Sequence, residues 1–247
     1  MSHLTDAVTI VTGASSGIGA ATAKRLAASG ARVVLAARNE ETLRALVSDI
    51  AEAGGAAVYR ATDVTEPADL RALVALAEET YGPVDILVNN AGLMLFSAWK
   101  DTALDDWDKM IDTNLRGYLY AIAAVLPSML ERKSGRILNL SSVAGIHAGD
   151  GTGVYSATKF FVRGITESLR KEVGVGSGLQ VSMVSPGVID TGWADKVTDA
   201  DGRKAATALN KDAIPPEAIA DAVAYALDQP ASVTVNDIVV HPTKQDW

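Results

Sequence analysis

The chain has 247 residues, of which 48% are hydrophobic, and a formal net charge of −8 at pH 7; this length fits one domain with a sizeable core. The acidic balance argues against binding to nucleic acid or to an anionic membrane, because no basic face is available to neutralise phosphates in bulk. The chain has no cysteine and only three scattered histidines, so we expect a small-molecule partner and no metal.

The N-terminus leads almost at once into the apolar segment Ala7–Val11. It has neither the basic n-region nor the apolar h-region of a signal peptide. No uninterrupted apolar run in the chain is long enough to span a bilayer. These observations predict a cytoplasmic protein.

Short β-branched segments alternate with longer alanine-rich helical patterns along the chain. This alternation is typical of a parallel sheet covered by helices on both faces, which binds ligands at the carboxyl ends of its strands. Because no low-complexity linker interrupts the pattern, we predict one Rossmann-like, doubly wound α/β domain over residues 1–247. The seven expected strands are Val8–Thr12, Arg32–Ala36, Ala57–Ala61, Ile86–Val88, Arg136–Leu140, Gln180–Val184 and Val235–Val240.

Three glycines lie where the first strand turns into a helix, with the spacing G-x-x-x-G-x-G. Glycine there lets the backbone approach a phosphate closely, and the N–H groups and positive end of the following helix favour a pyrophosphate. The alternative is an ordinary turn. The expected contacts are Gly13, Ser15, Ser16, Gly17, Ile18 and Gly19.

The end of the second strand indicates which cofactor is bound. A ribose 2′-hydroxyl would be bound by an acidic residue about 20 residues further on, but Ala37 and Arg38 stand there. A guanidinium pairs with a 2′-phosphate and can stack on adenine. We therefore predict NADP as the cofactor, with NADPH preferred over NADH; a surface arginine at the start of a loop is the alternative.

Polar residues also follow the third and fourth strands. A carboxylate after the third strand could accept from the adenine amino group, or it could simply cap the next helix. The amides after the fourth strand face the same crevice unless they only form a turn. The expected contacts are Asp63 and Val64 after the third strand, and Asn90, Ala91 and Gly92 after the fourth.

Asn114 lies in a predicted helix that runs to about Glu131. An asparagine in a helix interior is mildly unfavourable and usually faces solvent. The functional alternative is a kink whose carbonyl or amide holds a water beside Lys159.

The fifth strand ends in two neighbouring serines, Ser141 and Ser142. Their side chains must point to opposite sides, so only one of them can face the crevice. A hydroxyl there can hydrogen-bond a substrate carbonyl oxygen. Capping of the strand end is the alternative.

Tyr155 and Lys159 lie one turn apart at the start of a predicted helix that ends near Val173, so their side chains share a face. A phenol is a poor acid at neutral pH, but a neighbouring ammonium favours its charged form and lowers its pKa. The pair is a candidate proton donor. A helical tyrosine with a solvated lysine one turn away is the alternative for this spacing alone.

The sequence after the sixth strand turns at Pro186 and Gly187. Residues 192–214 are rich in charged residues, Gly, Ala and Thr, and Pro215-Pro216 then starts a helix. We predict that residues 192–214 form a substrate-binding lid. A mobile surface insertion is the alternative.

Together these motifs resemble the short-chain dehydrogenase/reductase family in its form of about 250 residues. The motifs that carry the resemblance occur in the family's order and cover almost the whole chain. They are Thr12-Gly13-x-x-x-Gly17-x-Gly19, Asn89-Asn90-Ala91-Gly92, Asn114, Ser142, Tyr155-x-x-x-Lys159 and Pro186-Gly187.

The resemblance implies roles for four side chains. Tyr155 would be the general acid/base, and Lys159 would lower its pKa and bind the nicotinamide ribose. Ser142, the second of the two serines, would position the carbonyl, and Asn114 would hold a proton-relay water.

The resemblance also implies how the nicotinamide ring is held. The backbone of Ile189 and the hydroxyl of Thr191 match positions that bind the nicotinamide carboxamide, next to Pro186 and Gly187. Contacts of this kind would fix which face of the ring delivers the hydride.

The last strand departs from one branch of the family. Val235–Thr243 lacks the Asn-Gly-Gly that follows this strand in acyl-carrier-protein reductases. It looks more like NADP-dependent 3-hydroxy-acid or serine dehydrogenases and clavulanate-type aldehyde reductases. The resemblance implies an NADPH-dependent carbonyl reductase of a ketone or aldehyde, reversible as an alcohol dehydrogenase, and by family habit a homotetramer or homodimer.

Two other functions stay open. A nucleotide-binding regulator on the same fold would need no proton path. A 3-oxoacyl-carrier-protein reductase would want a basic docking patch near the site, for which the candidates are Arg132, Lys133, Arg163, Arg170 and Lys171. The substrate pocket is expected to be apolar, with walls formed by Met94, Leu95, Ile146, His147, Val188 and Trp193.

Overall fold

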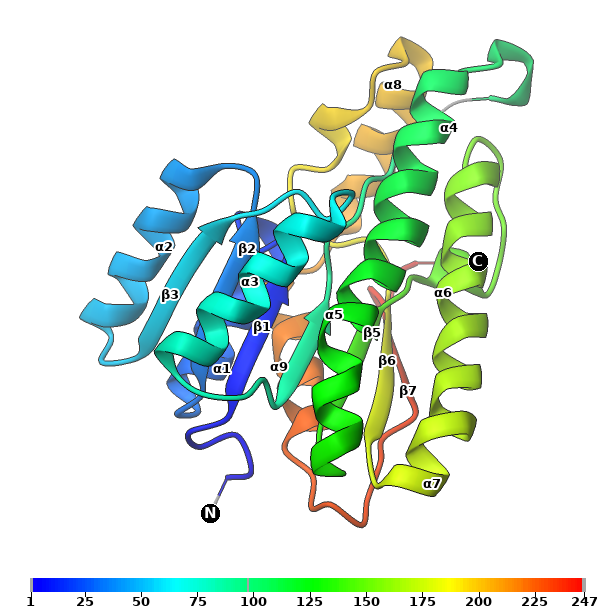
Figure 1. The fold of residues 1–247 in the computed structure, drawn as a ribbon. Coiled ribbons are helices and arrows are strands. Elements are labelled where there is room, and N and C mark those ends of the chain that lie inside the picture. The colour runs from blue at the N-terminus through cyan, green and yellow to red at the C-terminus, as the bar shows by residue number, and fades with distance from the viewer. Residues whose placement is uncertain (1, 97, 246–247) are drawn as a thin grey trace.

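Seven parallel strands form a single sheet in the order β3-β2-β1-β4-β5-β6-β7 in the computed structural model, which describes residues 2–96 and 98–245 (Figure 1). Every predicted strand is present, although β7 begins at Asp237 rather than at Val235. The strands are β1 (Val8–Thr12), β2 (Arg32–Ala37), β3 (Ala56–Ala61), β4 (Ile86–Asn89), β5 (Arg136–Leu140), β6 (Gln180–Pro186) and β7 (Asp237–Val240).

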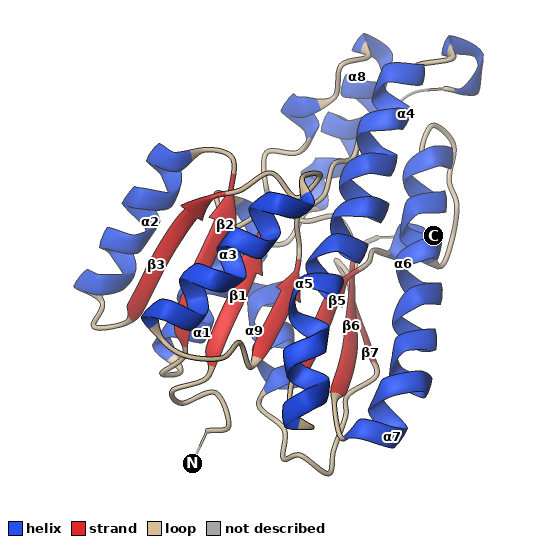
Figure 2. Ribbon diagram, viewed as in Figure 1, coloured by secondary structure: helices blue, strands red, loops and turns tan. Residues whose placement is uncertain are grey.

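Helices connect the strands and cover both faces of the sheet (Figure 2). The helices are α1 (Gly17–Ala28), α2 (Glu40–Glu52), α3 (Pro67–Thr80), α4 (Leu104–Ile111), α5 (Gly117–Arg132), α6 (Gly153–Leu169), α7 (Val175–Ser177), α8 (Ala200–Leu209) and α9 (Pro216–Leu227). Short turns of 3-10 helix are η1 (Trp99–Asp101), η3 (Val143–Gly145), η5 (Ala194–Lys196) and η6 (Asn210–Asp212). Two π-helical turns are η2 (Asp112–Arg116) and η4 (Arg170–Gly174).

Local sequence explains where helices begin. Asn39 caps α2 by accepting a hydrogen bond from the Thr42 N–H at 3.1 Å, and Glu40 and Glu41 complement the positive end of the helix. Helices α3 and α9 each begin with a proline, whose missing N–H would have no partner in the first turn.

The two faces of the sheet bury separate hydrophobic cores. On one face, α1, α2 and α9 contribute side chains such as Leu26, Leu43 and Ile219. On the other, α3 and α5 contribute side chains such as Leu70 and Val125. Apolar residues at helical spacing thus cover a sheet whose central strands are buried on both faces, as expected for parallel strands.

The strand order reverses between β1 and β4, which are neighbours in the sheet. In a doubly wound sheet, the loops after such a pair diverge to opposite faces and leave a crevice at the carboxyl edge. Helices α4 and α8 lie beyond this edge, at the top of Figure 1. The fold therefore places a site between the strand ends and these two helices.

Candidate active site

A cavity of about 1220 Å³ lies along the carboxyl edge of the sheet. Every residue that the sequence predicted to contact the cofactor lines this cavity, as do Ser142, Tyr155 and Lys159. The loops after β1, β2, β3, β4, β5 and β6 all contribute to its walls. One continuous space therefore joins the glycine loop to the tyrosine and the lysine.

Hydrogen bonds connect the glycine loop to the end of β4. Gly13 and Gly17 have φ angles of +66° and +53°, a left-handed conformation that favours glycine. The Asn90 side-chain amide donates to the Thr12 and Gly13 carbonyls at 2.9 and 3.2 Å, so its role here is to hold the loop. A Cβ on Gly19 would lie 2.2 Å from the Gly13 oxygen, so only glycine allows α1 to begin this close to the loop.

The hydroxyls of the loop are left available. Ser16 precedes α1 as its N-cap but makes no side-chain capping bond, and the side chains of Ser15 and Ser16 form no hydrogen bond with the described residues. Unused hydroxyl and N–H donors at a helix N-terminus suit an anion.

Arg38 is exposed at the end of β2 and lines the cavity. Its guanidinium makes no hydrogen bond or ion pair with residues 2–96 or 98–245. The side-chain oxygen of the neighbouring Asn39 is occupied as the cap of α2. An unpaired guanidinium at this edge is free to meet a phosphate.

Asp63 orders the loop after β3. One of its carboxylate oxygens accepts from the Thr65 N–H at 3.0 Å and from the Thr65 hydroxyl at 2.8 Å. The N-cap of α3 is Glu66, so neither Asp63 nor Thr65 caps that helix, contrary to one sequence alternative. Asp63 and Val64 both line the cavity, and the contact of Asp63 with adenine stays a prediction.

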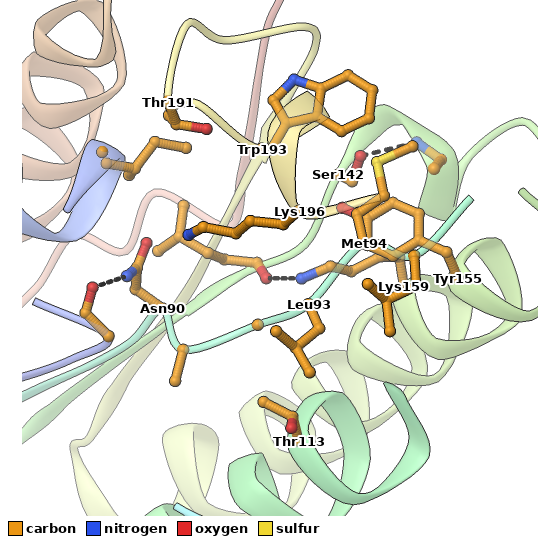
Figure 3. Close-up of a pocket in the computed structure, with 18 of the residues that line it drawn as sticks. Asn90, Leu93, Met94, Thr113, Ser142, Tyr155, Lys159, Thr191, Trp193 and Lys196 are labelled. Atoms are coloured by element: carbon orange, nitrogen blue, oxygen red, sulfur yellow. Dashed lines mark hydrogen bonds between the residues drawn. The ribbon is translucent and has the colours of Figure 1, made fainter. Parts of the chain in front are cut away.

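The two serines after β5 face different partners. The Ser141 hydroxyl donates to the Lys159 main-chain oxygen at 3.1 Å. The Ser142 hydroxyl accepts from the Ala144 N–H at 3.1 Å, and it lies on the same side of the cavity as Tyr155 (Figure 3). The Ser141 hydroxyl is thus directed at α6, whereas the Ser142 hydroxyl also donates to the Pro186 carbonyl after β6 at 3.4 Å, and the contact of Ser142 with a substrate stays a prediction.

Tyr155 stands near the start of α6, and it lines the cavity together with Ser142. Burial raises the pKa of the phenol, and the smaller effect of the Ser142 side chain lowers it. The prediction that the Lys159 ammonium lowers this pKa is wrong for the cofactor-free chain, because the ammonium lies 5.8 Å from the centre of the Tyr155 ring and donates elsewhere. The phenol is therefore protonated at neutral pH.

Lys159 is only 4% exposed, which rules out a solvated lysine. Its ammonium donates to the Leu140 carbonyl at 2.9 Å and lies 5.4 Å from the centre of the Tyr118 ring. The Tyr118 hydroxyl donates to the same Leu140 oxygen at 2.8 Å. Burial lowers the pKa of Lys159 to about 7.

We expect Lys159→Met to stabilise the cofactor-free protein below pH 7. A lysine that titrates near 7 when folded and near 10.5 when unfolded destabilises the fold fully below pH 7, and this penalty disappears as the pH rises to 10.5. The difference between the two pKa values corresponds to a destabilisation of roughly 5 kcal/mol, which the substitution would remove. This figure is an upper bound, because the substitution also removes the hydrogen bond to Leu140. The measurement is the free energy of unfolding of the variant and of wild type in urea at pH 6 and pH 9.

Lys196→Met is the matched control, because this lysine lines the same cavity but is exposed. Its effect on stability should not depend on pH in this range. A stability difference between Lys159→Met and wild type that is equal at pH 6 and pH 9 would contradict a depressed pKa.

Asn114 lies in the π-helical turn η2, which interrupts the α-helical pattern between α4 and α5 at the position where a kink was one of the two alternatives. The side chain is fully buried and does not line the cavity. Its amide pairs with both the N–H and the carbonyl of Leu93, each at 2.8 Å, and donates to the Thr158 hydroxyl at 3.1 Å. Both N–H donors of the amide are therefore in use, and the water-holding role of Asn114 stays a prediction.

Five of the six predicted pocket walls line the cavity: Met94, Leu95, His147, Val188 and Trp193. Ile146 does not, and this prediction is wrong. The reason is local, because Ser142 caps the tight turn η3 and the Ile146 N–H closes it on the Val143 carbonyl. Val143 and Ala144 form the wall at this point instead.

Residues 192–214 fold into η5, α8 and η6 and contribute Trp193, Lys196, Thr198 and Leu209 to the cavity wall. Ala194, Val197 and Ala206 pack with Phe96 in a small hydrophobic cluster. The Thr198 hydroxyl donates to the carboxylate of Asp106 in α4. The segment is thus packed on the loop after β4 and on α4.

Several residues at this site carried no signal in the sequence. Tyr118 supports Lys159 from α5, Lys196 extends across the cavity in Figure 3, and Gln245 lines the cavity from the segment after β7. Their positions depend on contacts between distant segments. Only the spacing of Tyr118, one turn after Asn114, could have linked it to the site.

Within the part of the chain that the structure describes, no group of three or more His, Cys, Asp or Glu side chains is placed to hold a metal ion. None of the helices described combines the length and the apolar character needed to cross a membrane.

A family model described as short chain dehydrogenase matches residues 7–202. The chain belongs to the short-chain dehydrogenase family. Its fold and its class as an oxidoreductase are thereby confirmed. This short-chain dehydrogenase is 46% identical over 242 residues to an uncharacterised oxidoreductase of Listeria monocytogenes, with 97% of this chain and 98% of the relative covered.

Two solved structures of the family resemble this short-chain dehydrogenase closely. One is a serine dehydrogenase complexed with NADP+, with a TM-score of 0.89, 33% identity and coverage of 97% of this chain and 96% of that one. The other is a short-chain dehydrogenase/reductase from Burkholderia phymatum in complex with NAD, with a TM-score of 0.89, 26% identity and coverage of 97% and 90%. Members of this fold thus bind either dinucleotide.

Proposed function

We propose that this short-chain dehydrogenase is an NADPH-dependent reductase of a ketone or aldehyde, which also runs in reverse as an alcohol dehydrogenase. The observation that carries the proposal is the convergence of Ser142, Tyr155 and Lys159 on one cavity with the glycine loop. A protein that only bound the nucleotide would need neither a phenol nor a serine beside a buried lysine.

The donors at the other end of the cavity fit the phosphates of an NADP cofactor. The hydroxyls of Ser15 and Ser16 are unused, and the Arg38 guanidinium is unpaired among the described residues. We assign the pyrophosphate to the glycine loop and the 2′-phosphate to Arg38. When bound, the nicotinamide supplies or accepts the hydride.

The proton path is built from this chain's own side chains. Ser142 holds the substrate carbonyl oxygen, and Tyr155 donates its phenolic proton to that oxygen. Lys159 stabilises the phenolate that remains and binds the nicotinamide ribose. A water on the main-chain carbonyl of Asn114 then returns a proton from solvent.

Residues 192–214 serve as the lid in this proposal. Their packing on Phe96 and the bond between Thr198 and Asp106 keep the segment over the cavity. A lid of this kind excludes water from the reacting groups. Slower proteolysis within residues 192–214 on addition of NADPH would support this assignment, and an unchanged rate would contradict it.

Reduction of a carrier-bound acyl chain is less well supported. Arg132 and Lys133 precede β5, and Arg170 and Lys171 precede β6, so these four lie toward the amino edge of the sheet, away from the cavity. Arg163 is paired with Asp237 at 2.8 Å. These residues do not gather beside the cavity mouth as a docking patch would.

Decay of NADPH absorbance with a panel of chemically varied ketones and aldehydes tests the proposal. We expect turnover of at least one carbonyl class. Tight NADPH binding with no turnover across the panel would favour a regulatory protein instead. Sedimentation velocity on the same sample tests the expected homotetramer or homodimer, which a monomer at micromolar concentration would contradict.

A further inference from the structure

The segment after β7 returns to the cavity. Gln245 lines the cavity, and its side-chain oxygen accepts a hydrogen bond from the Val188 N–H at 3.0 Å. The Gln245 N–H donates to the Pro242 carbonyl at 2.9 Å, which fixes the turn that presents this side chain. Val188 is itself a wall of the cavity, just after β6.

The chain makes room for this contact at Gly187. A Cβ there would lie 2.3 Å from the Gln245 side-chain oxygen and 2.5 Å from the His241 Cβ. The Gly187 N–H also donates to the Val240 carbonyl at 2.7 Å, which extends the pairing of β6 with β7. The loop after β6 and the segment after β7 are therefore packed together at the cavity wall.

The partner at Val188 determines how the Gln245 amide is oriented. A backbone N–H can only donate, so the amide must turn its oxygen toward Val188 and its NH₂ group away from it. This NH₂ group makes no hydrogen bond with the described residues. Gln245 is partly buried, but its NH₂ group is accessible, so a ligand in the cavity can accept a hydrogen bond from it.

We propose that Gln245 is a specificity-determining residue, whose amide NH₂ donates to a second oxygen on the substrate, beside the carbonyl that is reduced. The side chains of Met94 and Val188 in the neighbouring wall are apolar and cannot supply such a donor. Substrates with an adjacent ketone, ester or hydroxyl oxygen are therefore favoured over plain aliphatic carbonyls. This inference rests on the proposed function.

Two variants separate the donor from the structural contact. Gln245→Glu keeps an oxygen for the Val188 N–H but replaces the NH₂ donor with an acceptor, whereas Gln245→Leu removes both. Lys244→Ala is the control in the same segment, because its side chain is 82% exposed. The measurement is kcat/KM for two uncharged carbonyl compounds of equal chain length, such as 2,3-butanedione and 2-butanone, together with the dissociation constant of NADPH.

We expect the kcat/KM for 2,3-butanedione, divided by that for 2-butanone, to fall about 2- to 12-fold in both Gln245 variants. This is the range that one neutral hydrogen bond contributes. The ratio should stay unchanged in Lys244→Ala, and NADPH affinity should stay unchanged in all three. Comparing ratios cancels the different intrinsic reactivities of the two compounds.

An equal loss of kcat/KM for both compounds would overturn the proposal and leave Gln245 as a support for Val188. A weakened NADPH affinity in Gln245→Glu would also overturn it, because the NH₂ group would then contact the cofactor. If wild type reduces no carbonyl compound at all, the proposed function fails and this inference fails with it, whereas an unchanged ratio with active wild type overturns only the inference.

Discussion

Tyr155→Phe is expected to fold and to bind NADPH as wild type does, but to lose roughly 10²–10⁴-fold in turnover, the usual contribution of general acid–base catalysis. Only the hydroxyl is removed, and Tyr155 lines the cavity together with Ser142. The measurement is single-turnover reduction, so that product release does not mask the chemical step. Turnover near the wild-type rate would show that another group donates the proton.

Tyr120→Phe is the matched control, because Tyr120 lies in α5 and does not line the cavity. It should leave turnover unchanged.

The raised pKa of Tyr155 also predicts that carbonyl reduction and alcohol oxidation depend differently on pH. Reduction needs the protonated phenol and should persist at neutral pH, whereas alcohol oxidation needs the phenolate and should accelerate as the pH rises.

Arg38→Leu is expected to lower the affinity for NADPH about 10- to 150-fold while barely changing that for NADH. A hydrogen bond to a charged group contributes about 1.5–3 kcal/mol, and about 1.4 kcal/mol corresponds to a factor of ten. The Arg38 guanidinium lines the cavity and has no partner among the described residues. The measurement is the dissociation constant and kcat/KM for both cofactors.

The double variant Ala37→Asp with Arg38→Leu should complete a reversal toward NADH, because the new carboxylate accepts from a free 2′-hydroxyl and repels a 2′-phosphate. Arg60→Leu is the control, since Arg60 is exposed on β3 but does not line the cavity. An equal loss for both cofactors in Arg38→Leu, or a wild type that prefers NADH, would show that the 2′-position is bound by another residue.

The fold could be predicted from the sequence because each of its signals is local. β-branched runs such as Arg32–Ala36 and glycines at Gly13 and Gly17 act through their own backbone conformations, and the strands and the loop appear where expected. The break of the helix at Asn114 could be only partly predicted. A π-helical turn depends on the tertiary contact of its side chain with Leu93, which the sequence does not show.

The site could be predicted in its motifs but not in its electrostatics. The spacing of Tyr155 and Lys159 correctly placed both at one cavity, yet the direction of the Tyr155 pKa depends on how deeply the phenol is enclosed. Burial is a property of the assembled fold, and it outweighs the opposite effect of Ser142 on this pKa. The presence of Gln245 in the wall also depends on how distant loops pack, whereas the absence of Ile146 follows from the local turn η3.

The Leu140 carbonyl described above accepts from two donors, the Lys159 ammonium and the Tyr118 hydroxyl. Because two donors share this acceptor, the ammonium can move away without leaving the buried Leu140 oxygen unpaired. The Tyr118 hydroxyl continues to donate to that oxygen. Lys159 can therefore exchange this backbone contact for a hydrogen bond to a ligand at little enthalpic cost.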